Sequence, residues 1–273
     1  MTRAMNVVPS RGGRILLAIL PFLLIALVYV IGSAERRASN PDDKLLPPVS
    51  EMVATSKRLA AEPDRRSGEY VLWADTAASL RRLLLGLGIS AAIGLALGLT
   101  IGLLPVAGAG FGTLVAVLSM IPPMAVLPIL FIVFGLGELS KVVLIVFGVT
   151  PCLVRDLALR VQSLPREQMV KAQSLGASTW QIAIRVVLPQ IMPRLIESLR
   201  LQLGPAFLFL ISAEAIAADV GLGYRIFLVR RYLSMDVILP YVAWIMLLAY
   251  LMDVALAWLA RTAFRWAYVN ERT

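Results

Sequence analysis

Three acidic residues lie within or beside long apolar runs and are the first candidates for chemistry. They are Glu214, Asp219 and Asp253. A carboxylate in such a run is costly to bury, so it marks either a solute path or a buried ion pair. We expect Asp253 to form an ion pair among packed helices. Pairing is also favoured for Glu214, with a place on a translocation path as the alternative.

Other kinds of reactive site are excluded by composition. The chain has no histidine and one cysteine, Cys152, which sits in an apolar run where packing is its expected role. No nucleophile motif, metal-ligand cluster or phosphate-binding P-loop is found. We therefore expect no catalytic residue, no metal site and no cofactor in this chain, which would not hydrolyse ATP itself.

The apolar content decides the class of protein. Of 273 residues, 59% are hydrophobic and 16% are charged. Several runs reach about 20 residues, the length of helix that crosses a bilayer of about 30 Å. The sequence predicts an all-α polytopic membrane protein in a lipid bilayer, with six spans at 15–31, 78–104, 111–136, 139–159, 189–217 and 238–260.

The first run and the segment after it need separate interpretation. Basic residues precede the 15–31 run as in a signal peptide, but the run is long and a cleavage site is poor, so an uncleaved span is favoured. Residues 34–77 hold most of the acidic side chains and no long apolar run. They predict an extramembrane segment with a short amphipathic helix at 49–61.

Small residues and prolines mark two spans. In the second span, small residues recur every fourth position at Gly86, Ser90, Gly94, Gly98 and Gly102, which predicts a face for close helix packing. The third span is interrupted by prolines, and irregular backbone at membrane depth must be buried or must line a cavity. Two roles stay open for Pro122, Pro123, Met124 and Pro128: they line a translocation path, or they form a kink that serves packing.

Charge indicates the orientation of the spans. The net charge is +9, and basic residues cluster at the N-terminus, in the 160–189 loop and near the C-terminus, which would place all three in the cytoplasm. Total basic counts on the two sides are nearly equal, so this support is limited. The basic residues are scattered around the spans and form no soluble basic face, so no nucleic acid is expected as a partner.

Local rules divide the 160–189 loop into two short helices. Ser163, Pro165 and Glu167 suit a first turn, and Gly176 suits the end of that helix because glycine adopts positive φ. Ser178 and Gln181 have the spacing of a capping box for a second helix.

The same loop resembles the EAA loop of ATP-binding-cassette (ABC) importer permeases. The resemblance rests on Lys171-Ala172-Gln173-Ser174-Leu175-Gly176-Ala177 and on Val186-Val187-Leu188-Pro189, with nine residues between Gly176 and Val186. Further stretches are similar to the nitrate, sulfonate and taurine branch of this family, namely 78–82, 121–128, 134–141, 213–218 and 221–223. Together they cover about residues 45–262.

This resemblance implies a function, partners and site residues. The fold would be that of a type I ABC importer permease, with a core at 78–262 between a periplasmic segment at 34–77 and a cytoplasmic tail at 263–273; residues 1–33 would hold the N-terminus and first span. Two copies would form the path in a bacterial inner membrane, with a cytoplasmic ABC ATPase dimer that binds ATP and Mg²⁺ and with a periplasmic solute-binding protein. The loop residues expected to contact the ATPase or shape that contact are Ala172, Leu175, Gly176, Ala177, Ser178, Trp180, Leu188 and Pro189.

Three matters stay open at this level. The triplet before the glycine is Val170-Lys171-Ala172 and lacks the family's glutamate, whose role is vacant or taken by Glu167. The solute could be nitrate, a sulfonate such as taurine, bicarbonate or a compound of the urea or guanidine kind. A secondary transporter or channel driven by an ion gradient is the alternative function.

Overall fold

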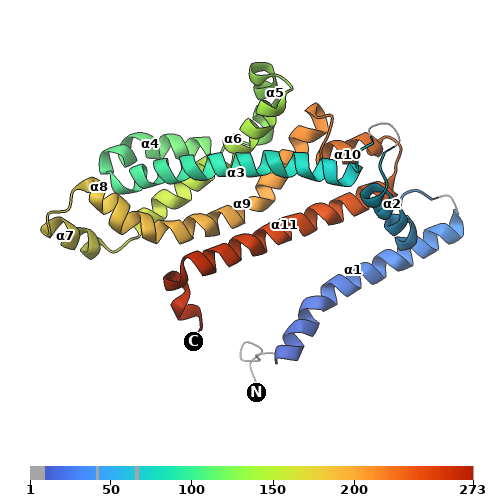
Figure 1. The fold of residues 1–273 in the computed structure, drawn as a ribbon, viewed down its shortest axis with the longest axis horizontal. Coiled ribbons are helices and arrows are strands. Elements are labelled where there is room, and N and C mark those ends of the chain that lie inside the picture. Colours follow the sequence, from blue (N-terminus) through green and yellow to red (C-terminus); the bar gives the residue numbers. More distant parts are fainter. Residues whose placement is uncertain (1–9, 41–42, 65–67, 273) are drawn as a thin grey trace.

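The computed structural model describes residues 10–40, 43–64 and 68–272, and most of these lie in helices. The longer helices run roughly along one axis of the molecule (Figure 1). In chain order the elements are α1 (Arg11–Ser39), α2 (Val49–Ala61), α3 (Val71–Leu103), α4 (Pro105–Leu118), α5 (Pro123–Phe134), α6 (Glu138–Gln162), α7 (Arg166–Ser174), α8 (Thr179–Ile182), the π-helical turn η2 (Ala183–Val187), α9 (Leu188–Ala217), α10 (Leu222–Arg230), α11 (Met235–Ala263) and the 3₁₀ helix η3 (Arg265–Arg272).

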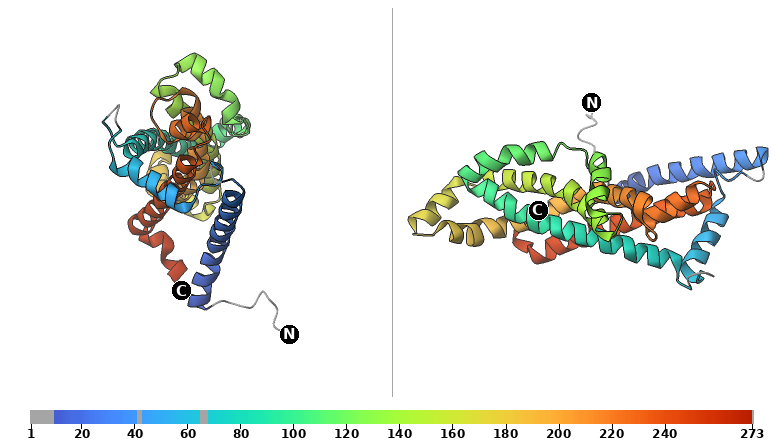
Figure 2. Two further views of the ribbon diagram at one scale, coloured as in Figure 1. Left: turned by 90° about the vertical axis from the view of Figure 1, so that its right-hand side faces the viewer. Right: turned by 90° about the horizontal axis from the view of Figure 1, so that it is seen from above.

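Five of the described helical segments are long and apolar enough to cross a membrane, and a bent pair makes a sixth. The pair is α4 and α5, whose axes differ by 94° across a short break. Figure 2 shows the sharp change of direction between them. Pro122 and Pro123 lie at this break, as expected for residues that cannot continue a helix. The prediction of an all-α membrane protein is therefore confirmed, with six spans when the bent pair counts as one.

The core of the bundle is built on a close contact between α3 and α6. Within the row of small residues, a Cβ atom added at Gly98 would lie 2.7 Å from Leu157 Cβ, and one added at Gly86 would lie 2.6 Å from the Ile145 side chain. The absence of side chains lets the two backbones approach, so that dispersion contacts between them are dense. The predicted packing face on α3 is confirmed.

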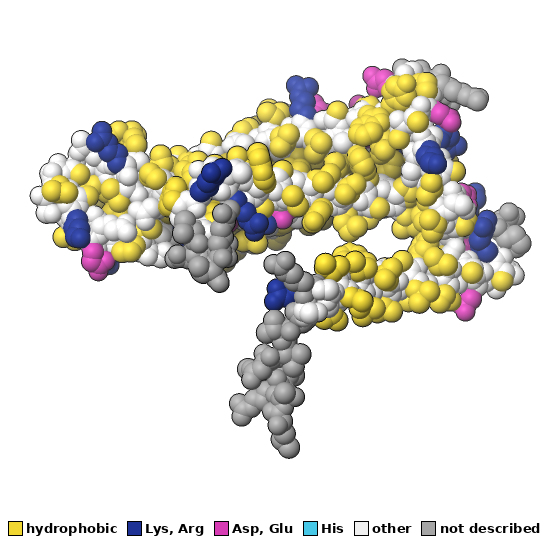
Figure 3. All heavy atoms as spheres, turned by 60° about the horizontal axis from the view of Figure 1, so that its bottom comes forward, with side chains coloured by type: hydrophobic (Ala, Val, Ile, Leu, Met, Phe, Trp, Pro, Cys, Tyr) yellow, Lys and Arg dark blue, Asp and Glu magenta, His cyan; other side chains and the backbone are white. Residues whose placement is uncertain are grey.

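Helix α1 stands apart from this bundle. Its apolar side chains are exposed along its length, and Figure 3 shows a gap between α1 and the other helices. Polar contacts hold its C-terminal end: Tyr29 Oη donates to the Pro47 carbonyl at 2.6 Å and Ser33 Oγ to the Leu46 carbonyl at 2.8 Å. Arg36 also pairs with Asp43 at 2.6 Å, and this hydrogen bond holds the pKa of Asp43 below its usual range.

Three predicted boundaries are corrected and one is confirmed. Helix α3 begins at Val71 rather than 78, so Asp75 lies in this helix, where its side chain is buried. The third apolar region begins at Pro105 rather than 111, because proline is well suited to the first turn of a helix. Ser163 ends α6 and does not begin the next helix. The amphipathic helix at 49–61 is present as α2.

Replacing Gly98 by alanine tests the contact between α3 and α6. The added methyl group would press on Leu157, and we expect a loss of about 1–3 kcal/mol of stability, as for other overpacked cores. The measurement is the thermal midpoint of the purified protein in detergent, read by size-exclusion profiles after heating.

Gly88→Ala is the matched control, because Gly88 is on the same helix and nothing lies within 4 Å of its added Cβ. An equal midpoint for the two variants would contradict close packing at Gly98.

Candidate functional site

A buried carboxylate lies where three helices meet. The Glu214 side chain on α9 is fully buried. It accepts hydrogen bonds from Arg82 Nη1 at 2.6 Å, from Ser79 Oγ at 2.8 Å and from the Gly223 amide at 2.9 Å. The carboxylate therefore joins α3, α9 and the first turn of α10, where the amide groups at a helix N-terminus favour negative charge.

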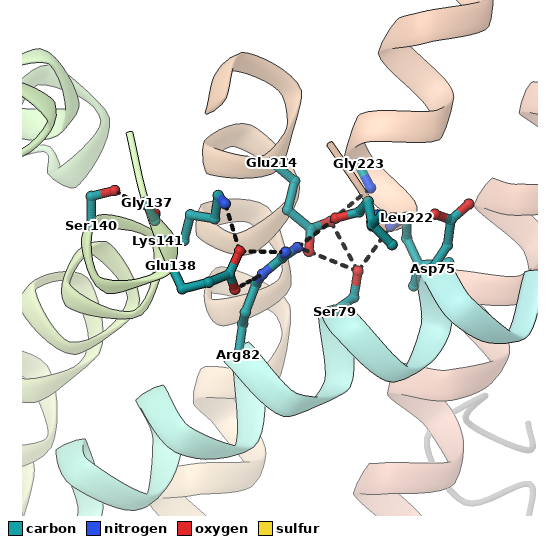
Figure 4. Close-up of polar contacts among 12 residues, drawn as sticks. Asp75, Ser79, Arg82, Gly137, Glu138, Ser140, Lys141, Glu214, Leu222 and Gly223 are labelled. Carbon is teal, nitrogen blue, oxygen red and sulfur yellow. Dashed lines mark hydrogen bonds and ion pairs between the residues drawn. The ribbon is translucent and has the colours of Figure 1, made fainter. Parts of the chain in front are cut away.

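Arg82 extends this cluster to the beginning of α6 (Figure 4). Its Nε donates to Glu138 at 2.6 Å, and Lys141 Nζ donates to the same carboxylate at 2.8 Å. Arg82 Nη1 also reaches the Val220 carbonyl at 2.8 Å. One guanidinium thus bonds to side chains or backbone from α6, α9 and the segment before α10.

A second buried acid strengthens the same region. Asp75 is fully buried and accepts from the Gly221 amide at 3.0 Å, from Arg225 Nε at 2.8 Å and from Tyr241 Oη at 2.9 Å. Gly221 has φ +144, and a Cβ there would lie 2.6 Å from Glu214 Cδ. Only glycine fits this approach of backbone to carboxylate. We call Asp75, Ser79, Arg82, Glu138, Glu214 and Arg225 the ion-pair cluster.

Sequence reasoning predicted pairing for Glu214 but did not name its partners. Asp75, Ser79 and Arg82 are separated by four and three residues, which places them on one face of a helix. That spacing is the available signal, but the predicted span begins at 78 and leaves Asp75 out. Arg82, Ser79 and the Gly223 amide all donate to Glu214, and this geometry favours a structural role for the carboxylate.

The expected pairing of Asp253 is present. Arg200 on α9 makes two hydrogen bonds to Asp253 on α11, at 2.8 and 2.9 Å. Asp219, in the segment between α9 and α10, takes no part in the ion-pair cluster.

At the other end of the bundle the 160–189 loop forms two helices, α7 and α8, as predicted. Gly176 follows α7 with φ +80, the conformation expected of a glycine that ends a helix. Ser178 Oγ accepts from the Gln181 amide while Gln181 Oε1 accepts from the Ser178 amide, so the predicted capping box is confirmed. The turn between α7 and α8 is thereby fixed at both ends.

Two large apolar side chains on this loop are exposed. Leu175 is 88% exposed and Trp180 is 74% exposed. Ala172 and Ala177, in contrast, are partly buried. They pack against the buried apolar cluster that contains Leu157 of α6. The loop thus packs on the bundle through small residues and presents Leu175 and Trp180 outward.

Trp180 also borders an apolar groove beside α3. The groove has a volume of about 770 Å³ and is lined by α3, α8, η2 and Leu188. Leu188 and Pro189 form the first turn of α9 directly after η2. No break separates Thr179 from Ala217, so a single helical path of 39 residues leads from the loop past Glu214.

The residues predicted to line a translocation path lie in α5 or directly before it. Pro122, Met124 and Pro128 are exposed and Pro123 is half-buried. Further along α5, Ile132 is 84% exposed and Val133 is 65% exposed. Helix α5 lies well away from α7 and α8 in Figure 1. The hydrogen bonds described for Glu214 come from α3 and α10 and not from α5.

Comparisons with known proteins find similar proteins over most of the chain. Residues 83–265 match the family model of binding-protein-dependent transport system inner membrane components. The taurine transport system permease protein TauC of Escherichia coli is 33% identical over 221 residues, which are 81% of this chain and 80% of that protein. The bicarbonate transport system permease protein CmpB of Synechococcus elongatus is 32% identical over 206 residues, 74% of this chain and 73% of that one.

The fold also matches a solved structure. A chain of the MetNI methionine ABC transporter, in an inward-facing conformation, superposes with a TM-score of 0.63 at 19% identity, covering 73% of this chain and 99% of that one. At this identity the likeness concerns the fold alone.

Removal of Arg82 tests the ion-pair cluster. Arg82→Met would leave the buried Glu214 carboxylate without its counterion, and we expect a loss of about 3–5 kcal/mol of stability. The double variant Arg82→Met with Glu214→Leu should regain at least half of that loss, because the buried carboxylate that lost its counterion is then removed as well. Thermal midpoints in detergent measure both.

Arg81→Met is the control, since Arg81 is the exposed neighbour of Arg82. If the double variant were no more stable than Arg82→Met alone, ion pairing would not be what holds these helices together.

Proposed function

Since this chain belongs to the family of binding-protein-dependent transport system inner membrane components and is the permease subunit of an ABC importer, we propose that α7 and α8 receive the motion of a separate ATPase. That ATPase binds the ATP and Mg²⁺, and this chain carries out no hydrolysis. The observation that carries this proposal is the loop itself. It is fixed by a glycine turn and a capping box, and it presents Leu175 and Trp180 to a partner.

The contact with the ATPase is apolar in this account. Exposed leucine and tryptophan side chains gain free energy when a partner removes them from water, and tryptophan is frequent among the residues that dominate interface energies. Val170, which stands where the family has glutamate, is 60% exposed and adds to this apolar surface. Glu167 lies in the first turn of α7 and supplies the acid of this region.

The orientation follows from the position of this loop. We place α7 and α8 in the cytoplasm of a bacterial cell, with the protein in the inner membrane. The first residues of α1 and the end of α11 are directed toward the same side as α7 in Figure 1, so both chain ends are placed in the cytoplasm. The ion-pair cluster and α10 then face the periplasmic side.

Two copies of this chain form the path. In a single copy of the chain, the bent pair α4 and α5 and the break between them have exposed apolar side chains, including Met120, Ile129, Ile132 and Val133. A second copy that covers this face would enclose Pro122, Met124 and Pro128 between the subunits. ATP-driven closure of the ATPases moves the two loops together and opens the path outward, and hydrolysis returns it to the inward-facing state.

The cargo is a small polar solute delivered by a solute-binding protein. The relatives named for taurine, aliphatic sulfonates and bicarbonate suggest a sulfonate or another small oxyanion, with nitrate and compounds of the urea or guanidine kind as further candidates. Selectivity among these is assigned mainly to the binding protein.

Co-purification with the cognate ATPase, followed by hydrolysis and uptake in lipid vesicles, tests this function. Proline cannot adopt φ +80, so Gly176→Pro should distort the turn and reduce ATP-driven uptake at least tenfold. Residual hydrolysis should no longer respond to the binding protein.

Gly176→Asn is the matched control, because asparagine tolerates the left-handed conformation, and it should retain most of the uptake. Failure of the unmodified chain to bind any ATPase would refute the proposed function. Normal uptake by Gly176→Pro would refute only the role of the turn.

A further inference from the structure

An exposed turn at the end of α10 has an unusual conformation. It comprises Arg230, Arg231, Tyr232 and Leu233, and we call it the outer turn. Leu233 has φ +52, the only positive φ at a non-glycine residue among those described, and its side chain is 51% exposed. A leucine in this region costs about 1–2 kcal/mol, and such strain persists only where surrounding structure imposes it. Strain of this kind is more frequent at functional sites than elsewhere.

The outer turn presents positive charge together with aromatic surface. The Arg230 guanidinium lies 4.9 Å from the centre of the Phe227 ring, and that of Arg231 lies 5.4 Å from the Tyr232 ring. Neither arginine makes an ion pair with any acid that the structure describes. Arginine and tyrosine are enriched among residues that dominate binding energy at protein interfaces. The turn is therefore suited to an acidic protein surface.

Helix α10 connects this turn rigidly to the ion-pair cluster. At its start the Gly223 amide bonds to Glu214 at 2.9 Å and the Gly221 amide to Asp75 at 3.0 Å. One turn later, Arg225 bonds to Asp75 at 2.8 Å. A displacement of the outer turn would thus reach α3 and α9 through one short helix that is bonded to both.

We propose that the outer turn is the docking contact for the acidic rim of the solute-binding protein, and that α10 transmits docking to α9. This inference rests on the proposed function, which supplies the binding protein as partner. The outer turn lies at the end of the bundle opposite α7 and α8 (Figure 1), where that partner would arrive. Lipid headgroups are the competing occupant, but a fluid headgroup layer adapts to any basic residue and needs neither a strained leucine nor a rigid connection.

Direct binding measurements test this proposal. The permease and ATPase complex is placed in lipid nanodiscs, and the affinity of the cognate binding protein is measured at low and at moderate salt. Arg230→Glu with Arg231→Glu should weaken binding about tenfold or more and reduce its dependence on salt. Replacement of rim acids on the binding protein by lysine should restore part of the affinity.

Lys57→Glu with Arg58→Glu is the matched control. These two substitutions make the same change of charge at exposed positions of α2, a different element at the same end of the bundle. We expect binding within about twofold of the unmodified complex, because long-range attraction between exposed charges is weak at physiological salt. Equal losses in both double variants would contradict a specific contact at the outer turn.

Leu233→Gly gives an independent result that does not depend on charge. Glycine relieves the strain and removes the apolar side chain, so the thermal midpoint should stay or rise while binding weakens at least threefold. Unchanged binding in both Leu233→Gly and the arginine double variant would overturn the proposal. If those arginine changes instead reduced only retention of anionic lipid, the turn would be assigned to headgroups. Absence of any binding to the unmodified complex would refute the proposed function, a different outcome from these.

Discussion

The Glu214 carboxylate, buried among α3, α9 and α10, is the interaction on which the rest of the structure depends. An ionised group at this depth is tolerated only with a charged partner and a full set of hydrogen bonds. Arg82, Ser79 and the Gly223 amide supply them, and each comes from a position that the backbone must hold accurately. The requirement explains why α3 extends beyond the apolar run, and why a glycine-rich segment brings the first turn of α10 against an acid.

The ion-pair cluster and the 160–189 loop lie at opposite ends of the same rigid elements. The α8, η2 and α9 segments form one helical path of 39 residues that leads from the loop past Glu214. Helix α3 packs along α6 through glycines that leave little freedom for sliding. The π-helical turn between α8 and α9 is the exception in this path, and such turns are often found where function requires a departure from regular helix. Because the path is continuous, motion imposed on α8 would move α9 as a whole and so reach the ion-pair cluster.

Patterns local in the chain could be predicted from the sequence, and contacts distant in the chain could not. The helix at 49–61, the capping box of Ser178 and the positive φ of Gly176 depend on a few neighbouring residues, and all were predicted. The two side chains that donate to Glu214, from Ser79 and Arg82, are more than 130 residues away along the chain, and no local rule pairs them with it. The 94° bend was foreseen only as an effect of Pro122 and Pro123, since its size is set by how α5 packs. The positive φ of Leu233 could not be predicted, because leucine rarely adopts this conformation.

The central claim is that this chain moves a solute with energy from a partner ATPase, and uptake by proteoliposomes tests it most directly. Vesicles would contain the purified permease and its ATPase, with ATP inside and binding protein with labelled solute outside. The account predicts uptake that requires internal ATP and the binding protein and that persists when ionophores collapse all ion gradients. Uptake driven by a proton or sodium gradient without ATP would contradict it and would identify the chain as a secondary transporter.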